Sequence, residues 1–224
     1  MLCRLSNPEN LQSPAPDGNV GWADMIGTGF LCNSKGYILT AAHNVTLGDT
    51  IGFSVTDDVN AFNPERKFKL RFFRATVVQH DALNDVALLQ SLDDLDYLSA
   101  DYDSILGHED SVPVGSSLCY MGYPYSHMFQ HSIKISGCVL SSKILTTSGS
   151  RRLMLDTLVE IGNSGGPVFD VASEKIIGIV VGRFKPAQMQ GSVVIGEHEL
   201  GTISSISYAS AISNGLELLK AQGV

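Results

Sequence analysis

A serine lies among glycines in residues 162–167, which read GNSGGP and lead directly into an apolar strand. Glycines at such positions let the backbone turn sharply and approach a ligand closely, because they have no Cβ atom. A serine held in this kind of turn can present its hydroxyl as a nucleophile, while nearby backbone N–H groups point at a developing oxyanion. For this segment taken alone, an ordinary turn between two strands is the competing interpretation.

Two upstream segments contain the partners that a serine nucleophile needs. Residues 37–45 read YILTAAHNV, a strand that runs into small residues and then His43. Residues 84–90 read NDVALLQ, which places Asp85 at the start of another apolar strand. A serine nucleophile needs an imidazole base, and the base needs a carboxylate that fixes its tautomer. The chain order His43, Asp85, Ser164 is one of three orders found for this geometry, and it belongs to the chymotrypsin-like arrangement.

Other residues of the same types compete for two of these roles. Asp81 lies four residues before Asp85 and is the rival carboxylate, but we expect it to shape the loop. Five further histidines lie in polar or loop contexts without a matching motif, and we treat them as structural or exposed: His80, His108, His127, His131 and His198.

Three blocks resemble the signature blocks of trypsin-like serine proteases: TAAH at 40–43, DVALL at 85–89 and GNSGGP at 162–167. Further segments are similar to the HtrA/Deg-like branch of that family: GTGF at 27–30, GYP at 122–124, ISG at 135–137 and the pair Tyr208-Ala209. The resemblance covers most of the chain, residues 22–220. It implies an all-β fold of two six-stranded antiparallel β-barrels (chymotrypsin-like) with a C-terminal helix. The active site is then expected in the cleft between the barrels.

The same resemblance implies roles for single residues. His43, Asp85 and Ser164 are the expected catalytic triad. The expected oxyanion hole consists of the backbone N–H groups of Gly162 and Ser164, each typically worth about 2.7–4 kcal/mol in the transition state.

The resemblance also implies where a substrate binds. Leu158 lies six residues before the serine and is expected at the base of the primary pocket, where it suits an apolar side chain. Val180, Val181 and Gly182 are expected on the strand that pairs with the substrate backbone.

Asn163 departs from animal trypsins, which have an aspartate there that captures a newly cut N-terminus. Asparagine has no charge to pair with an ammonium, and the chain lacks an Ile-Val-Gly-Gly start. We therefore do not expect activation by zymogen cleavage. Either the loop is competent as made, or another group orders it.

Short apolar runs between turn residues predict strands along most of the chain. The predicted strands are residues 29–32, 37–40, 51–55, 67–78, 86–90, 117–121, 130–136, 138–141, 152–156, 167–170, 176–181 and 202–207. Helical spacing of apolar residues predicts a closing helix at 212–222, and the glycines in 185–201 predict a loop. We expect an extended N-terminal lead-in (1–20), a first β-barrel lobe (21–105) and a second β-barrel lobe with the C-terminal helix (106–224), with residues 91–112 as the connector.

Composition excludes several classes of function. The chain has 15 Lys and Arg against 23 Asp and Glu, a net charge of −8, which disfavours nucleic-acid binding. No apolar run approaches the roughly 18 residues of a membrane span. There is no CxxC pair, which argues against a zinc site. We expect neither a metal nor an organic cofactor.

The cysteines do not form an evident disulfide framework. Asn44 follows His43, at the place where secreted trypsin-like enzymes have a cysteine that pairs with one in the preceding strand, so Cys32 lacks that partner. Buried free thiols fit a reducing compartment. The N-terminus does not show the pattern of a signal peptide. On these grounds we expect a cytoplasmic protein.

The expected function is that of a serine endopeptidase, which cleaves a polypeptide substrate after apolar residues through an acyl-enzyme intermediate. The alternative is a catalytically latent or inactive module that keeps the protease fold for binding or regulation. An activating partner, or covalently linked domains of a longer protein, is compatible with either hypothesis.

Overall fold

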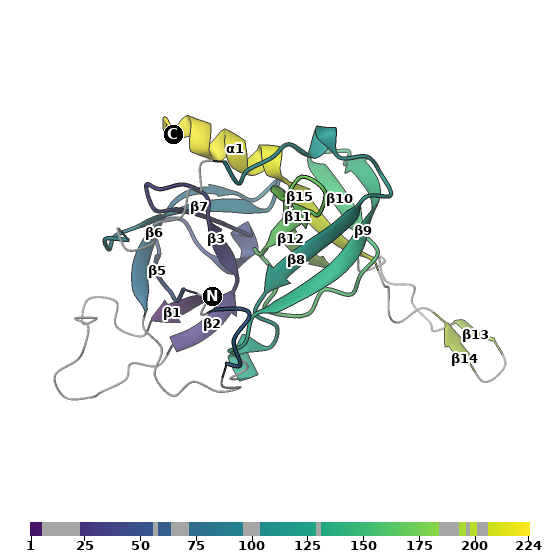
Figure 1. The fold of residues 1–224 in the computed structure, drawn as a ribbon, viewed down its shortest axis with the longest axis horizontal. Coiled ribbons are helices and arrows are strands. Elements are labelled where there is room, and N and C mark those ends of the chain that lie inside the picture. The colour runs from purple at the N-terminus through teal and green to yellow at the C-terminus, as the bar shows by residue number, and fades with distance from the viewer. Residues whose placement is uncertain are drawn as a thin grey trace.

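The computed structural model describes residues 1–5, 23–55, 58–63, 72–95, 104–128, 131–183, 193–195, 198–200 and 206–224. Strands dominate these residues, as Figure 1 shows, and the one α-helix among them closes the chain. The strands form an open sheet, a closed barrel and a separate two-stranded hairpin. Within the described part of the chain, no helix is both long and apolar enough to cross a membrane.

The first half of the chain forms a seven-stranded antiparallel sheet in the order β2-β1-β5-β6-β7-β4-β3. Its strands are β1 (Leu2–Leu5), β2 (Ala23–Gly27), β3 (Gly29–Leu31), β4 (Tyr37–Thr40), β5 (Thr50–Phe53), β6 (Phe73–Asp81) and β7 (Val86–Ser91). The two edge strands, β2 and β3, are separated in sequence by Thr28 alone. The chain itself therefore joins the two edges, and the sheet curls into a half-barrel around a core that includes Ile38, Ile51 and Leu89.

The second half forms a closed six-stranded barrel in the order β10-β15-β12-β11-β8-β9. Its strands are β8 (Ser117–Gly122), β9 (Lys134–Leu145), β10 (Arg151–Leu155), β11 (Pro167–Asp170), β12 (Lys175–Arg183) and β15 (Ser207–Ala211). Apolar side chains on alternate positions fill its interior, among them Leu118, Leu153 and Val168. The hairpin of β13 (Val193–Ile195) and β14 (His198–Leu200) falls in the segment predicted as a loop.

A third apolar cluster joins the sheet, the barrel and the helix α1 (Ile212–Ala221). Leu39 and Leu88 come from the sheet, Ile179 from the barrel, and Ile212 and Leu219 from α1. Figure 1 shows α1, in yellow, next to β7 and β15, and the helix contacts both strands as well as β12. Burial of this cluster fixes the relative position of the sheet and the barrel, because apolar area removed from water stabilises by about 25 cal/mol per Å².

The all-β, chymotrypsin-like fold class with a C-terminal helix is confirmed. The first lobe is a seven-stranded open sheet rather than the expected six-stranded barrel, because β1 adds a strand to it. Three further details differ from the sequence prediction. The strands expected at 130–136 and 138–141 are one strand, β9, because Gly137 continues the pairing opposite Cys119. Residues 2–5, expected in an extended lead-in, form β1 between β2 and β5. The strand expected at 202–207 lies mostly outside the described residues, and β15 begins at Ser207. The division into lobes at residues 105 and 106 stays a prediction.

Candidate active site

His43 and Asp85 lie in direct contact. His43 is in a short 3₁₀ turn, η2 (Ala42–Asn44), that follows β4, and Asp85 immediately precedes β7. Because β4 pairs with β7, the two residues come together at one end of the ladder. The His43 ring atom Nδ1 lies 2.8 Å from Asp85 Oδ2, and the His43 backbone N–H donates to Asp85 Oδ1 at 3.0 Å. A carboxylate so placed holds the imidazole with Nε2 free for chemistry.

The surroundings of Asp85 keep it ionised. Burial of its carboxyl favours the neutral form, yet the hydrogen bonds and charge of His43, together with the charge of Arg152, outweigh burial and lower the pKa of Asp85 below its ordinary value. Its backbone has a φ of 55°, in the left-handed region that non-glycine residues seldom adopt. Strain of this kind persists only where neighbouring groups hold the chain.

Asp81 holds the loop before Asp85 rather than the histidine. Its Oδ1 accepts hydrogen bonds from the backbone N–H groups of Leu83 and Asn84, at 3.0 and 3.1 Å. Its Oδ2 accepts from the Asn84 side chain at 2.6 Å. Asp81 therefore shapes the loop that presents Asp85, as its place in the sequence suggested.

Ser164 lies in the turn between β10 and β11, flanked by glycines with positive φ, 99° at Gly162 and 86° at Gly165. A Cβ atom on Gly165 would lie 2.1 Å from the Thr28 carbonyl oxygen, so only glycine fits there. Among the described residues, the Ser164 hydroxyl donates to the Val181 carbonyl at 2.9 Å rather than to His43.

The two peptide groups expected to form the oxyanion hole are each held at their carbonyl end. The Ile161 carbonyl accepts from the Tyr125 N–H at 2.8 Å, and the Asn163 carbonyl accepts from the Gly166 N–H at 2.9 Å. In a trans peptide the N–H points away from the C=O. The N–H groups of Gly162 and Ser164 accordingly point the other way, and neither donates to an acceptor in the described part of the chain.

Asn163 is buried and tethered to a charged pair. Its Nδ2 donates to Glu160 Oε2 at 2.9 Å, and Glu160 Oε1 pairs with the Lys134 ammonium at 2.6 Å. That hydrogen bond to Glu160 raises the pKa of Lys134. Asn163 Oδ1 is buried without a hydrogen-bond partner among the described residues. Glu160, which is itself paired with Lys134, thus accepts a hydrogen bond from the side chain at the position where animal trypsins have an aspartate.

Three polar residues of the first half of the chain support the serine turn, and the sequence analysis gave none of them this role. Thr28 donates its backbone N–H to the Ser164 carbonyl at 2.9 Å and its hydroxyl to the Gly162 carbonyl at 2.7 Å. Thr40 Oγ1 donates to the Thr28 carbonyl at 2.6 Å. Asn44 Nδ2 donates to the Ser164 carbonyl at 2.9 Å. The signal in the sequence was the presence of polar residues in apolar segments, but the partners that Thr28 and Asn44 have in the serine turn lie 134 and 120 positions away.

Two of the residues expected to bind substrate, Val180 and Val181, contact the same turn. Val180 exchanges backbone hydrogen bonds with Gly165 and Gly166, at 2.7 and 2.8 Å, and Val181 accepts the Ser164 hydroxyl. Gly182 follows on the same strand, with no atom within 4 Å of the place where a Cβ would lie. Leu158, after β10, is 37% exposed and thus accessible to a ligand.

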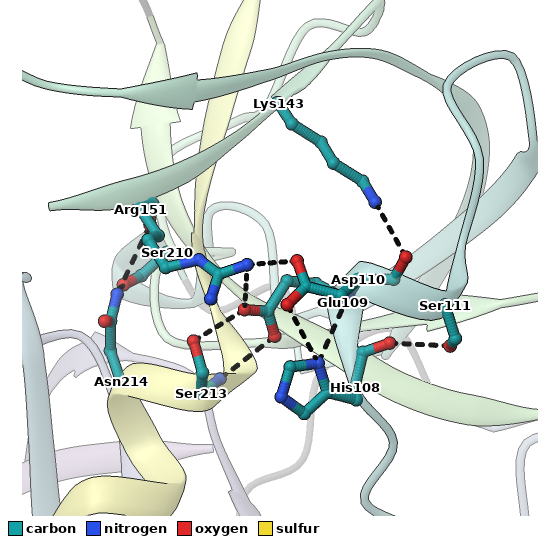
Figure 2. A network of polar contacts seen from close by, with 9 residues as sticks. All are labelled: His108, Glu109, Asp110, Ser111, Lys143, Arg151, Ser210, Ser213 and Asn214. Atoms are coloured by element: carbon teal, nitrogen blue, oxygen red, sulfur yellow. Dashed lines mark hydrogen bonds and ion pairs between the residues drawn. The ribbon is translucent and has the colours of Figure 1, made fainter.

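One cluster away from this site has the residue types of a metal site. His108, Glu109 and Asp110 offer ligand atoms within 4.8 Å of one another. Figure 2 shows that Arg151 pairs with both carboxylates and that Ser213 donates to Glu109. Because these oxygens already have protein partners, the cluster is best described as a structural network.

Comparisons with known proteins identify the family of the chain. The family described as trypsin-like peptidase domain matches residues 27–179. A probable periplasmic DegP-like serine endoprotease of Pseudomonas fulva is 29% identical over 178 residues, 78% of this chain and 32% of that protein. A namesake from Halomonas elongata is 30% identical over 174 residues, 75% of this chain and 32% of that protein. The magnetosome formation protease MamE of Paramagnetospirillum magneticum is 26% identical over 187 residues, 81% of this chain and 23% of that protein.

Solved structures share the fold. The HtrA-type protease AlgW with a decapeptide superposes with a TM-score of 0.64 at 21% identity, over 90% of this chain and 52% of that one. The chain spans between about a quarter and a third of the length of these curated relatives, 23% to 32%.

The expectation of a cytoplasmic location is wrong: the relatives from Pseudomonas and Halomonas are both named as periplasmic proteins. The expectation relied on unpaired thiols and on an N-terminus without the pattern of a signal peptide. Burial raises the pKa of Cys3 and Cys32 to about 12, so the thiolate that disulfide exchange requires is scarce at neutral pH. Cys119 lies opposite Gly137 and Cys138 opposite Leu118, so the alternation of the strands turns these two side chains to different faces. Thiols in such places stay free in either compartment.

Proposed function

The chain belongs to the trypsin-like peptidase domain family, and on that premise we propose that it is a serine endopeptidase. It hydrolyses peptide bonds through a triad of Ser164, His43 and Asp85 and an acyl-enzyme intermediate. The observation that carries this proposal is the 2.8 Å contact of His43 Nδ1 with Asp85, next to a serine turn whose two N–H groups lack acceptors among the described residues.

The reaction begins when the Ser164 hydroxyl leaves the Val181 carbonyl and turns toward His43 Nε2. The oxygen attacks the scissile carbonyl as Nε2 takes its proton, and Asp85 stabilises the imidazolium. The N–H groups of Gly162 and Ser164 bind the oxyanion. His43 then gives the proton to the leaving amine, which departs with the C-terminal fragment. Water, deprotonated by His43, cleaves the ester in the same manner and restores the Ser164 hydroxyl, with no cofactor involved.

The polypeptide substrate lies along the backbone of Val180, Val181 and Gly182, with its side chain before the scissile bond directed at Leu158. Leucine offers no charge to a basic side chain, and a buried unpaired ammonium is costly. Glu160, the nearby carboxylate, is already engaged by Lys134 and Asn163. An apolar side chain gains roughly 25 cal/mol per Å² buried in the same place.

Cleavage of a denatured protein, read by mass spectrometry, tests this specificity. We expect most cuts after small or medium apolar residues such as Val, Ala or Leu, with Lys and Arg disfavoured. Replacing Leu158 with aspartate is expected to move cuts toward Lys and Arg, because the new carboxylate pairs with their charge. A majority of wild-type cuts after Lys or Arg would contradict the apolar pocket, and cuts after Asp or Glu would point to Arg183, whose Nε now binds the Val159 carbonyl.

One observation favours the alternative of a latent module. The Ser164 hydroxyl donates a hydrogen bond to the Val181 carbonyl at 2.9 Å, so it must rotate before His43 can accept its proton. A latent enzyme of this kind stays inactive until a substrate, an activating partner or a linked domain moves the serine. Peptide hydrolysis by the isolated chain, with a rate linear in enzyme concentration, distinguishes an enzyme competent as made from a latent one.

A further inference from the structure

Two side chains cross between the sheet and the barrel next to the proposed triad, one in each direction. Asn44, which follows β4 of the sheet, donates from Nδ2 to the Ser164 carbonyl at 2.9 Å. Ser210, in β15 of the barrel, donates from its hydroxyl to the Asn84 carbonyl at 2.8 Å. The two acceptors belong to Ser164 itself and to the residue just before Asp85. Each half of the fold thus holds the backbone at a triad residue of the other half.

Asn44 is built into its place. Its side chain is buried, and Nδ2 also lies 3.2 Å from Thr40 Oγ1. A Cβ atom on Gly27 would lie 2.5 Å from that nitrogen, so the absence of a side chain at Gly27 makes room for the amide. Together with the Thr28 N–H, Asn44 gives the Ser164 carbonyl two donors. A carbonyl with two donors fixes the orientation of the peptide that follows the nucleophile.

Ser210 is fully buried and is held by α1. Its hydroxyl accepts from Asn214 Nδ2 at 2.9 Å, and the same nitrogen lies 3.3 Å from the Arg151 carbonyl. Figure 2 shows Asn214 reaching from the first turn of the helix to these two oxygens. With its proton directed at Asn84, Ser210 orients the peptide that joins Asn84 to Asp85.

The position of α1 is itself anchored. Glu109 lies in a short 3₁₀ turn, η3 (Glu109–Ser111), and is 1% exposed. Its carboxylate accepts from the Ser213 hydroxyl at 2.6 Å and the Ser213 N–H at 3.2 Å, and pairs with Arg151 at 3.3 Å. The residue before α1, Ala211, provides no side-chain cap. Glu109 therefore takes the place of a cap and keeps the first helical turn, with Asn214, beside Ser210.

We propose that Asn44 and Ser210 are positioning residues for the endopeptidase reaction. The inference rests on the function proposed above. Asn44 fixes the backbone of Ser164, and with it the hydroxyl and the N–H that faces the oxyanion. Ser210 fixes the peptide before Asp85. Asp85 is thereby kept in its left-handed conformation, with its carboxylate directed at His43.

The two roles give different kinetic signatures. Loss of the Asn44 donor disturbs contacts made in the transition state, so kcat falls while KM changes little. Loss of the Ser210 donor loosens the contact of Asp85 with His43. The weakened contact then stabilises the protonated imidazole less. The acid limb of the kcat/KM profile then shifts to lower pH. The charged or titratable groups that act on Asp85 are His43 and Arg152, and the charge of each lowers the pKa of Asp85.

The experiment compares peptide hydrolysis by the wild type, Asn44→Leu, Ser210→Ala and the control Ser213→Ala. We expect kcat to fall roughly tenfold in Asn44→Leu with an unshifted profile; tenfold corresponds to about 1.4 kcal/mol. We expect a comparable loss in Ser210→Ala, with its acid limb displaced. Ser213→Ala removes the hydrogen bond from the Ser213 hydroxyl to Glu109 but keeps the one from the Ser213 N–H, which still holds the first turn of α1. We expect this control to lower the melting temperature while leaving the pH profile in place. Asn44→Ala replaces Asn44→Leu if the larger side chain prevents folding.

Rates within twofold of the wild type and an unchanged pH profile in both Asn44→Leu and Ser210→Ala would overturn the inference and leave the proposed function standing. A displaced acid limb in Ser213→Ala equal to that in Ser210→Ala would show a general loosening of the helix and would also overturn it. A folded wild type without any hydrolysis would overturn the proposed function, and the inference with it.

Discussion

Replacing Ser164 with alanine is expected to lower kcat for peptide hydrolysis by about 10⁶-fold, the loss typical of a nucleophile removed from such a triad. The serine carries the covalent step of the proposed reaction, and alanine has no oxygen with which to make the acyl-enzyme ester. The fold should remain intact, because the hydroxyl makes its hydrogen bond to one carbonyl of a strand that is otherwise paired. Initial rates on a fluorogenic peptide measure the loss, and circular dichroism and thermal unfolding measure the fold.

The matched control is Ser148→Ala, which changes an exposed serine in the turn between β9 and β10 and is expected to keep wild-type activity. Peptidase activity retained by a folded Ser164→Ala protein would show that the nucleophile lies elsewhere.

Replacing Asp85 with asparagine is expected to reduce kcat by about 10⁴-fold, since an amide favours the wrong imidazole tautomer. Asp81→Asn should be much less impaired, because Asp81 bonds to the loop and leaves His43 untouched. Its expected cost is a lower melting temperature, from weakened hydrogen bonds to Leu83 and Asn84. Steady-state kinetics of the two variants side by side measure the difference.

The pH dependence of folding stability, measured by thermal unfolding at acidic pH, adds a check on the same carboxylate. The pKa of Asp85 is lowered in the folded protein, so its charge and the stability that it contributes are present above the unfolded-state value of about 3.9. That contribution is lost as the pH falls through the lower folded-state pKa.

Equal rates for Asp85→Asn and Asp81→Asn at neutral pH, or the reverse order, would overturn the choice of Asp85.

Much of the fold could be read from local patterns. Apolar runs between turn residues predicted the bounds of β4 and β11 correctly, at 37–40 and 167–170. Helical spacing predicted α1 to within one residue. These elements are encoded locally, because side-chain alternation and helical periodicity act over a few residues. His43 and Asp85 could be singled out for a similar reason: His43 follows one recognisable strand, Asp85 precedes another, and pairing of β4 with β7 brings them together.

The contacts that support the site could not be read from the sequence in the same way. Asn44 was noticed only as a missing cysteine, and Ser210 not at all. Their partners lie 120 and 126 positions away, and the pairing depends on how the sheet and the barrel pack. The hydroxyl of Ser164 is a further example, because its partner, Val181, depends on a side-chain rotation that no sequence pattern encodes.

The most direct test of the proposed chemistry is the reaction of the folded wild type with a fluorophosphonate, followed by tandem mass spectrometry of the labelled peptide. Only a serine activated by a neighbouring base reacts readily with this class of reagent. We expect one phosphonyl group, on Ser164, with labelling greatly slowed in His43→Ala and absent in Ser164→Ala. A folded wild type with Ser164 unlabelled, or a rate of labelling unchanged by His43→Ala, would contradict a nucleophilic Ser164 activated by His43.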